Sequence, residues 1–541
     1  NRATYSSGGG ILLGGDTDAV VVQNALHGNT AEGAGGGLAS FAVGGLHPTV
    51  TNNTFTSNTA PVATALYAAT PATVSVTNNV MQGPAGRTVV ECQAAAYADL
   101  RHNDLFNGDP SATVTAGCGA VVGVNGNIAT DPRFTTYGSG TLRHPSPAMD
   151  AGQAPHPLLP GTDIQGNPRV VDGDGNGTAI VDMGAYESAG PDAGPAQAWG
   201  WNPVGELGDG TTLDRHLPQD VAGLTQVVQV AGGIYHSLAL RADGTVWAWG
   251  WNGLSQLGDG TTTDRHSPVP VAGLANVVAV SAGAYHSLAV KADGTVWAWG
   301  WNGVGQLGDG TTTDRYTPVA VAGLTGVSQV SAGAFHNLAR KGGGTVWSWG
   351  WNALGQLGDG TTTDRHTPVP VAGLSDVTEL AAGHYHNIAV QQGSIYLWGW
   401  NFAGQLGTKD TVDRLVPTRS NGASGMVRVA AGAAHTLALE GDGTVYAWGW
   451  NPLGQVGDGT TTDRNFPVFL GFGGENGVVE IAAGAYHSVL LHRDGTIKAW
   501  GWNVAGQVGD GTTTDRHAPV AVPVGPGTQA IGAGAFHTMG G

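Results

Sequence analysis

The chain has few cysteines, few charges and no long apolar run. Its only cysteines are Cys92 and Cys118, and no zinc-ligand spacing occurs among its 541 residues. Charged residues make up 11% of the chain, and 22 Lys and Arg against 40 Asp and Glu give a formal net charge of −18. No basic patch is visible, so we expect neither nucleic acid nor an anionic membrane surface as a partner. No apolar run reaches 18 residues, which predicts no transmembrane segment.

Glycine is abundant, with 91 residues, while 41% of the chain is hydrophobic. This composition excludes a disordered chain, and the glycines lack the triplet period of collagen. Many tight turns between short strands explain them better. The string W-G-W-N occurs seven times, beginning at Trp199, Trp249, Trp299, Trp349, Trp398, Trp448 and Trp500. The spacing of 49 to 52 residues indicates one structural unit repeated seven times.

Each repeat reads as about four short strands. Apolar and polar residues alternate on both sides of Asp293-Gly294, which is a strong hairpin signal. A polar loop, a short Pro-Val strand and a Gly-Leu turn follow, as in a propeller blade. The region opens with half a hairpin at 197–201 and ends with the other half at 533–539. We therefore expect an all-β protein in which pairing of N- and C-terminal strands closes a seven-bladed β-propeller.

The repeated pattern A-G-x-x-H-S…D-G-T-V-W-x-W-G-x-N-x-x-G-Q-L-G-D-G resembles the regulator of chromosome condensation repeat family over residues 196–541. This resemblance implies a seven-bladed propeller. The family includes nuclear exchange factors for a small GTPase, and also secreted bacterial propellers that bind proteins, such as inhibitors of β-lactamase. Because the exchange factors and the secreted binding proteins share this fold, the fold alone does not indicate which function the chain has.

Within the expected N-terminal domain, 1–187, residues 1 to about 130 carry a looser repeat with asparagine-rich turns at Asn24, Asn53, Asn79 and Asn103. The 24- to 29-residue spacing suits one coil of a parallel β-helix, with asparagines stacked in ladders. Together with residues 131–187, the region resembles the C-terminal end and cap of bacterial right-handed parallel β-helix surface proteins. Residues 188–195 read as a linker to the propeller at 196–541. Cys92 and Cys118 are one coil apart, so a disulfide is favoured, with two buried free thiols as the alternative.

Asp172, Asp174 and Asn176 alternate with glycines, as in a calcium loop, and Asp182 lies close by. Met183 stands where an EF-hand requires Glu, so the alternative is a simple Asp-Gly turn. We expect a weak Ca²⁺ site here at most, and no other cofactor.

Residues found in all copies are expected to hold the blades together. A histidine follows each A-G turn, and hydrogen bonding to a neighbouring blade explains it better than metal binding. The Asp264-Arg265 pair and its six equivalents read as charge pairs that fix loops, and the aspartates of the Gly-Asp-Gly turns as turn formers. The first Trp of each string is expected in the core.

The second Trp of each string enters the loop. If these side chains emerge on one face they form an aromatic crown that would bind a partner. The alternative is that each packs beneath the adjacent loop. The predicted binding residues are Trp201, Trp251, Trp301, Trp351, Trp400, Trp450 and Trp502.

No catalytic motif is found, so the chain is expected not to be an enzyme. We expect a secreted or cell-surface structural or binding protein of bacterial type that contacts protein, glycan or its own copies. The chain begins at Asn1, and we expect a processed or partial chain whose targeting segment is missing. The alternative is a polysaccharide lyase or hydrolase using Arg87, Asp99 and Arg101. Nucleotide exchange is the less favoured third reading, because a disulfide implies an oxidising compartment.

Overall fold

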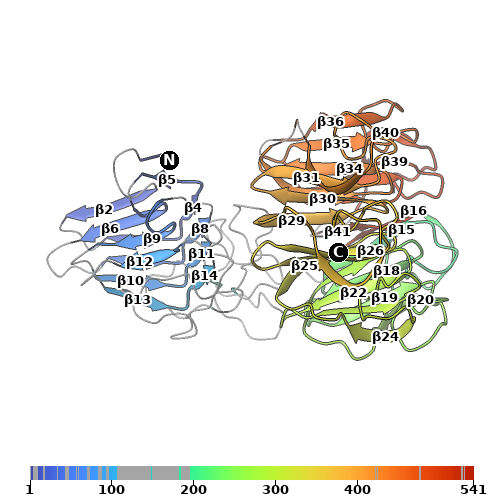
Figure 1. The fold of residues 1–541 in the computed structure, drawn as a ribbon, viewed down its shortest axis with the longest axis horizontal. Coiled ribbons are helices and arrows are strands. Elements are labelled where there is room, and N and C mark those ends of the chain that lie inside the picture. Colours follow the sequence, from blue (N-terminus) through green and yellow to red (C-terminus); the bar gives the residue numbers. More distant parts are fainter. Residues whose placement is uncertain are drawn as a thin grey trace. The chain divides into compact units, whose positions relative to one another are not determined.

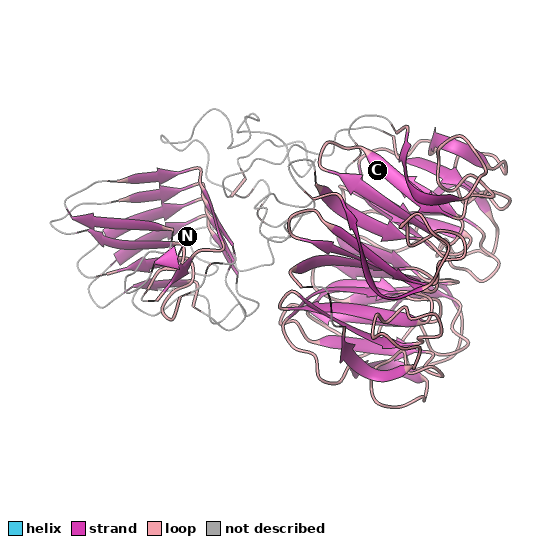
Figure 2. Cartoon of the chain, turned by 90° about the horizontal axis from the view of Figure 1, so that it is seen from above, coloured by secondary structure: helices cyan, strands magenta, loops and turns pink. Residues whose placement is uncertain are grey.

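The protein is described from a computed structural model, which divides into two compact units, Asn1–Pro191 and Asp192–Gly541. The described residues are 2–3, 10–15, 19–32, 34–42, 48–56, 58, 60–69, 73–82, 88–92, 97–106, 148, 151, 182–183, 195–420, 422, 424–473, 477–524, 528 and 530–541. They form strands, turns and loops and no helix (Figure 2). Consistently, none of them forms a helix long and apolar enough to cross a bilayer.

The first unit contains three four-stranded parallel sheets (Figure 1). The chain visits the sheets in turn, so each successive coil adds one parallel strand to each sheet. One sheet has the order β13 (Tyr97–Arg101), β10 (Thr73–Thr77), β7 (Thr49–Thr51), β3 (Val20–Val22); the second β14 (Asp104–Phe106), β11 (Val80–Gln82), β8 (Thr54–Thr56), β4 (Ala25–His27); the third β12 (Val90–Cys92), β9 (Leu66–Ala68), β6 (Leu38–Ala42), β2 (Ile11–Gly15). In addition, β1 (Arg2–Ala3) pairs with β5 (Thr30–Ala31).

An asparagine ladder runs across the coils at the turn between two sheets. Nδ2 of Asn24 donates to Oδ1 of Asn53 at 3.0 Å, Asn53 donates to Asn79 at 3.0 Å, and Asn79 donates to Asn103 at 2.9 Å. A second, shorter ladder joins Asn29 to Asn58 at 2.9 Å. The ladders satisfy buried turns that otherwise lack sheet partners. The predicted stacking of asparagines is confirmed.

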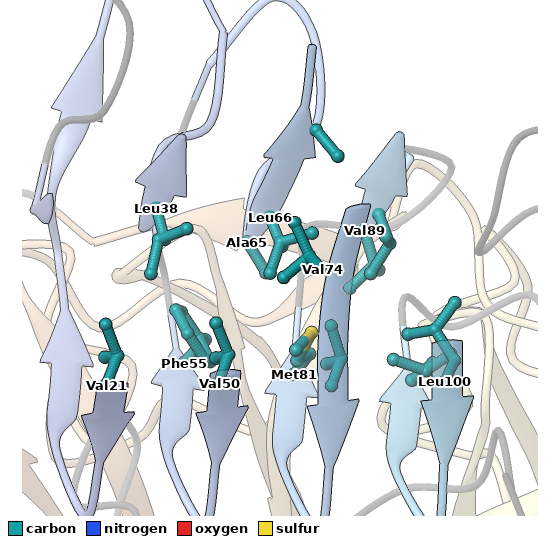
Figure 3. Close-up of a cluster of buried hydrophobic side chains, with 14 of the residues drawn as sticks. Val21, Leu38, Val50, Phe55, Ala65, Leu66, Val74, Met81, Val89 and Leu100 are labelled. Atoms are coloured by element: carbon teal, nitrogen blue, oxygen red, sulfur yellow. The ribbon is translucent and has the colours of Figure 1, made fainter. Parts of the chain in front are cut away.

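Aliphatic side chains from successive coils stack in rows inside the three sheets (Figure 3). Phe55 and Met81 come from neighbouring strands of one sheet, and Val50 lies beside Phe55 from another (Figure 3). Each coil therefore buries its apolar residues against the next coil, which is why the sequence repeats at coil length.

The second unit contains seven four-stranded antiparallel sheets, which are the blades of a β-propeller (Figure 1). Blades 1 to 3 are β17 (Val227–Gly232), β18 (His236–Arg241), β19 (Val246–Gly250), β20 (Arg265–Pro270); β21 (Val277–Ala282), β22 (His286–Lys291), β23 (Val296–Gly300), β24 (Arg315–Ala320); and β25 (Val327–Ala332), β26 (His336–Lys341), β27 (Val346–Gly350), β28 (Arg365–Pro370). Blades 4 to 6 are β29 (Val377–Ala382), β30 (His386–Gln391), β31 (Ser394–Gly399), β32 (Arg414–Arg419); β33 (Met426–Ala431), β34 (His435–Glu440), β35 (Val445–Gly449), β36 (Arg464–Gly471); and β37 (Val478–Ala483), β38 (His487–His492), β39 (Ile497–Gly501), β40 (Arg516–Val522).

Blade 7 is assembled from both ends of the unit. Its strand order is β16 (Arg215–Asp220), β15 (Gln197–Gly200), β42 (His537–Gly540), β41 (Ile531–Ala533). Gln197 of β15 pairs with Gly540 of β42 in an antiparallel ladder. The first strands of neighbouring blades contact one another, and β17 of blade 1 contacts β41 of blade 7.

The seven outermost strands are exposed sheet edges, and each carries a proline at its fourth residue. Proline cannot donate a ladder hydrogen bond, so these edges resist pairing with another chain. The prolines are Pro218, Pro268, Pro318, Pro368, Pro417, Pro467 and Pro519.

A repeated polar network joins each blade to the next. His286 of blade 2 bonds through Nε2 to Oδ1 of Asn337 in blade 3, at 2.7 Å, so Nε2 must carry the proton. Asn337 in turn donates to the backbone oxygen of Gln306 in the loop of blade 2. Equivalent histidine bonds occur at the other six junctions, from His236, His336, His386, His435, His487 and His537. The prediction that these histidines bond a neighbouring blade is confirmed.

The first Trp of each string is fully buried, as predicted. Six of the seven also tie two blades together, as when Nε1 of Trp299 in blade 2 donates to the oxygen of Gln256 in the loop of blade 1, at 2.9 Å. Blade 7 departs from this pattern, because Nε1 of Trp199 has no partner among the described residues.

The predicted partners of the repeated arginines need correction. Arg265 pairs with Asp259 of the Gly-Asp-Gly turn, at 2.6 Å, and not with its neighbour Asp264. Asp259 also accepts from the backbone N of Thr261, so it is both turn former and ion-pair partner. Asp264 instead accepts the backbone N–H of Asn252 at 2.8 Å.

Candidate binding face of the propeller

The turn inside each W-G-W-N string directs the second Trp out of the sheet. At Gly250 the ladder between β19 and β20 shifts register and φ is 101°. A Cβ at this glycine would lie 2.5 Å from the oxygen of Tyr235, so no other residue fits without rearrangement. Trp251 then donates its backbone N–H to that same oxygen at 2.8 Å. This glycine turn therefore fixes the position at which the second Trp leaves the sheet.

The seven predicted crown residues are all half-buried. Each contacts the ring of a Tyr or Phe that directly precedes a blade-joining histidine. Trp251, for example, lies between Tyr235 of its own blade and Tyr285 of the next, with ring centroids 6.1 and 5.6 Å apart and steep interplanar angles. Such edge-to-face pairs are favourable beyond simple burial.

An inner aromatic ring, not predicted from the sequence, accompanies the crown. Its six side chains follow the A-G turns, and several touch one another, as Tyr235 and Phe536 do at 5.9 Å. The signal was present, because an aromatic residue precedes the histidine in six of the seven copies. The members are Tyr235, Tyr285, Phe335, Tyr385, Tyr486 and Phe536. We call the end of the propeller that carries both sets the crown face.

The inner aromatic ring is interrupted at Ala434. In every other blade a Tyr or Phe at this position bridges two crown tryptophans, but Trp400 and Trp450 have no ring between them. The backbone is unchanged, since Trp450 donates to the oxygen of Ala434 at 2.8 Å. Trp400 instead stacks on Phe402, at 5.4 Å and 11°. Phe402 is 63% exposed, so this sector presents an exposed aromatic side chain beside the crown.

His384 lies directly beside this interruption. The other six copies have Ala or Ile at the equivalent position. The backbone N of His384 donates to the oxygen of Gly432, which belongs to the turn that carries Ala434. Burial lowers the pKa of His384 to about 4, although part of the side chain still meets solvent. The imidazole is therefore neutral at physiological pH.

Seven aspartates surround the crown. Asp264 accepts from the backbone N of Asn252, at 2.8 Å, and Asn252 follows the crown residue Trp251. The neighbouring arginines are engaged with the turn aspartates, so among the described residues no ion pair neutralises this set. We call it the outer aspartate ring: Asp214, Asp264, Asp314, Asp364, Asp413, Asp463 and Asp515.

Glu206 is a further departure from the repeat, since the other six copies have Gln. It is fully buried, and burial raises the pKa of its carboxyl to about 8. Oε2 accepts from the backbone N of Val204 at 3.1 Å, as Oε1 of Gln256 accepts from Leu254. A protonated carboxyl can therefore replace the amide at neutral pH.

The other predicted sites fall largely outside the described residues. Asp172, Asp174 and Asn176 do so, while Asp182 is fully buried and its neighbour Met183 packs on Val80 and Ala148. Cys92 is disulfide-bonded, and Cys118 lies outside the described residues, so their pairing stays a prediction. Arg87 also lies outside them, Arg101 is exposed at the end of β13, and the side chain of Asp99 is not described. Most of the expected linker, 188–194, is likewise not described.

The second unit is thus a seven-bladed propeller with an aromatic and acidic face. The Regulator of chromosome condensation (RCC1) repeat family matches it seven times, at 198–240, 243–290, 293–340, 343–390, 392–439, 442–491 and 494–540. The chain belongs to this family.

Solved structures of the same fold match the propeller as well. Human WBSCR16 is 26% identical with a TM-score of 0.59, covering 64% of this chain and 99% of the other. Prp20p from Saccharomyces cerevisiae, described for its binding to Gsp1p and histones, is 23% identical with a TM-score of 0.57, covering 64% and 90%. Yeast RCC1 (Prp20) bound to Kap60 is 24% identical with a TM-score of 0.57, covering 64% and 88%.

Proposed function

We propose that this protein is a secreted or cell-surface binding protein whose propeller holds a protein partner on the crown face. The observation that carries the proposal is the continuous arrangement of crown and inner aromatic rings, which are half-buried rather than sealed in the core. Tryptophan and tyrosine favour interfaces because they give large contact area at low entropic cost. Similar propellers whose structures are described with protein partners support a protein ligand in preference to a glycan or self-assembly.

The first unit acts in this proposal as a rigid support. Its stacked parallel sheets fit the end of a right-handed parallel β-helix of the kind displayed on bacterial surfaces. The disulfide at Cys92 favours an oxidising compartment and hence a location outside the cytoplasm. In this proposal the pairing of β15 with β42 closes the propeller and so holds the residues of the crown face in fixed positions.

Peptide selection on the immobilised protein tests the binding site. Random-sequence peptides displayed on phage should yield binders whose affinity falls about tenfold or more in the variants Trp301→Ala, Trp351→Ala and Trp400→Ala. Trp347→Ala is the matched control, because Trp347 lies in the same strand as Trp349 but packs near Lys341 at the hairpin end. Wild-type affinity in all three crown variants would refute the crown face as the platform. Selection of binders only from an oligosaccharide array would point to a glycan ligand instead.

The location has its own test. A membrane-impermeant biotin reagent should label the protein on intact cells of its source. Labelling that requires cell lysis would overturn a surface location, while leaving the binding result unaffected.

A further inference from the structure

We propose that the crown face takes a cationic segment of a partner protein, with one arginine of that segment seated at the missing-ring position beside Ala434. This inference rests on the proposed function and names the chemistry of the partner.

The first observation is the charge of the face. Each member of the outer aspartate ring is held by a backbone N–H next to a crown tryptophan, as Asp463 is by Asn451 at 2.8 Å. Each neighbouring arginine is already used, as Arg464 is by Asp458 at 2.6 Å. Repeated sevenfold, this leaves a circle of carboxylates around the aromatic rings. Such a circle attracts a basic segment and repels an acidic one.

The second observation is the shape of the missing-ring position. Trp400 and Trp450 are the crown residues on either side of Ala434, and the backbone there matches that of the other blades, because Trp450 still donates to the oxygen of Ala434. Tyr385 and Tyr486 flank the two tryptophans, at 5.8 and 5.5 Å respectively. A planar guanidinium matches an aromatic ring in shape and is attracted to aromatic faces. This attraction is stronger when the guanidinium is desolvated.

The third observation is the imidazole beside this position. His384 is the only polar side chain that replaces an Ala or Ile at the turns of the crown face. Because burial holds the pKa of His384 near 4, the imidazole carries no charge that would repel an arginine. The nearby cation Lys409 lies at the rim instead, since its backbone N donates to Asn465 in the outer strand of blade 5.

Binding of short synthetic peptides to the full chain tests the inference. The probe is an eight-residue peptide of alternating Gly and Arg with blocked ends, compared with the Gly-Lys and Gly-Glu versions by isothermal titration calorimetry. We expect the arginine peptide to bind best and the glutamate peptide not to bind. The dissociation constant of the arginine peptide should rise about tenfold between 50 and 500 mM NaCl, because salt screens the outer aspartate ring.

Substitutions locate the site. Ala434→Tyr places at this position the aromatic residue found in four of the other six copies and should weaken arginine-peptide binding about tenfold. Phe402→Ala should weaken arginine-peptide binding about threefold. Because the side chain of Phe402 is exposed, this variant should fold normally and tests the site even if Ala434→Tyr misfolds. The pair Asp413→Asn and Asp463→Asn should weaken binding and flatten the salt dependence. The matched control pair is Asp293→Asn and Asp494→Asn, which lie in hairpin turns at the other end of their blades from the W-G-W-N strings. This pair should leave the affinity and its salt dependence unchanged.

The inference is wrong if the arginine and glutamate peptides bind equally, if neither binds, or if Ala434→Tyr binds like the wild type. Its failure is distinguishable from failure of the proposed function. Selected peptides that depend on Trp301 and Trp351 but lack arginine and lysine would keep the crown face as a platform and remove only its preference for cations.

Discussion

Glu206→Gln should stabilise the propeller by an amount that grows with pH. The carboxyl replaces a glutamine found in the other six copies, is fully buried, and has a pKa raised by burial from 4.5 to about 8. The folded state therefore prefers the protonated form. The contribution of this proton to the free energy of unfolding is fully present below pH 4.5. It is lost progressively as pH rises to about 8 and changes no further above that pH.

The magnitude follows from the size of the shift. One pKa unit corresponds to about 1.4 kcal/mol, so the interval between 4.5 and 8 amounts to about 5 kcal/mol. Because Gln does not ionise, the variant should match the wild type near pH 4.5, be more stable by about 3 kcal/mol at pH 7, and by about 5 kcal/mol at pH 8.5.

Urea unfolding followed by tryptophan fluorescence measures this difference. All 17 tryptophans lie between Trp199 and Trp502, so the signal reports the propeller alone. The reciprocal variant Gln256→Glu is the control, because it places a carboxyl at the same position of the next copy and should introduce the same loss with pH. A gain from Glu206→Gln that is independent of pH would refute the reasoning, as would wild-type pH dependence in Gln256→Glu.

Three further predictions concern the two units. Trp299→Ala should lower the free energy of unfolding by about 3–5 kcal/mol and Trp301→Ala by less than about 2, because only Trp299 is fully buried and bonded to Gln256; equal losses by urea unfolding would contradict this. Asn79→Ala removes the ladder bonds that join Asn79 to Asn53 and to Asn103 and should cost about 2–4 kcal/mol, seen as faster hydrogen exchange in β8 and β14; unchanged exchange would show that the ladder contributes little. Burial lowers the pKa of the seven blade-joining histidines from 6.5 to about 3 or 4. Their contribution to the free energy of unfolding is therefore fully present above pH 6.5 and is lost as pH falls toward 4. Unfolding at pH 5 should then take up about six protons, and an unfolding free energy that is flat between pH 6.5 and 5 would contradict it.

The repeat alone was sufficient to predict the blades. Seven W-G-W-N strings at nearly constant spacing require seven equivalent sheets, and their alternating strands specify which side chains are buried. The asparagine spacing likewise predicted the ladders, because an amide bonds the amide one coil away. Local patterns of this kind carry over to structure because each blade or coil meets the same neighbours.

The partner of each arginine could not be predicted in the same way. Asp259 and Asp264 are both near Arg265 in the sequence, and the sequence favoured the adjacent one. The loop folds back so that Asp259 faces the guanidinium, while Asp264 caps the N–H of Asn252. Proximity along a chain says little about contact across a loop.

The sequence by itself determined the number of blades, the buried tryptophans and the histidines that join blades, because sevenfold repetition exposes whatever every copy needs. Only the tertiary structure decided what the differences between copies mean. Ala434, His384 and Phe402 lie in separate parts of the repeat, and each alone is an ordinary substitution. The turns at 384 and 434 are hydrogen-bonded neighbours, and Phe402 stacks on the tryptophan beside them. Residues distant in sequence thus form one sector of the crown face, because a propeller places the turns of adjacent blades side by side.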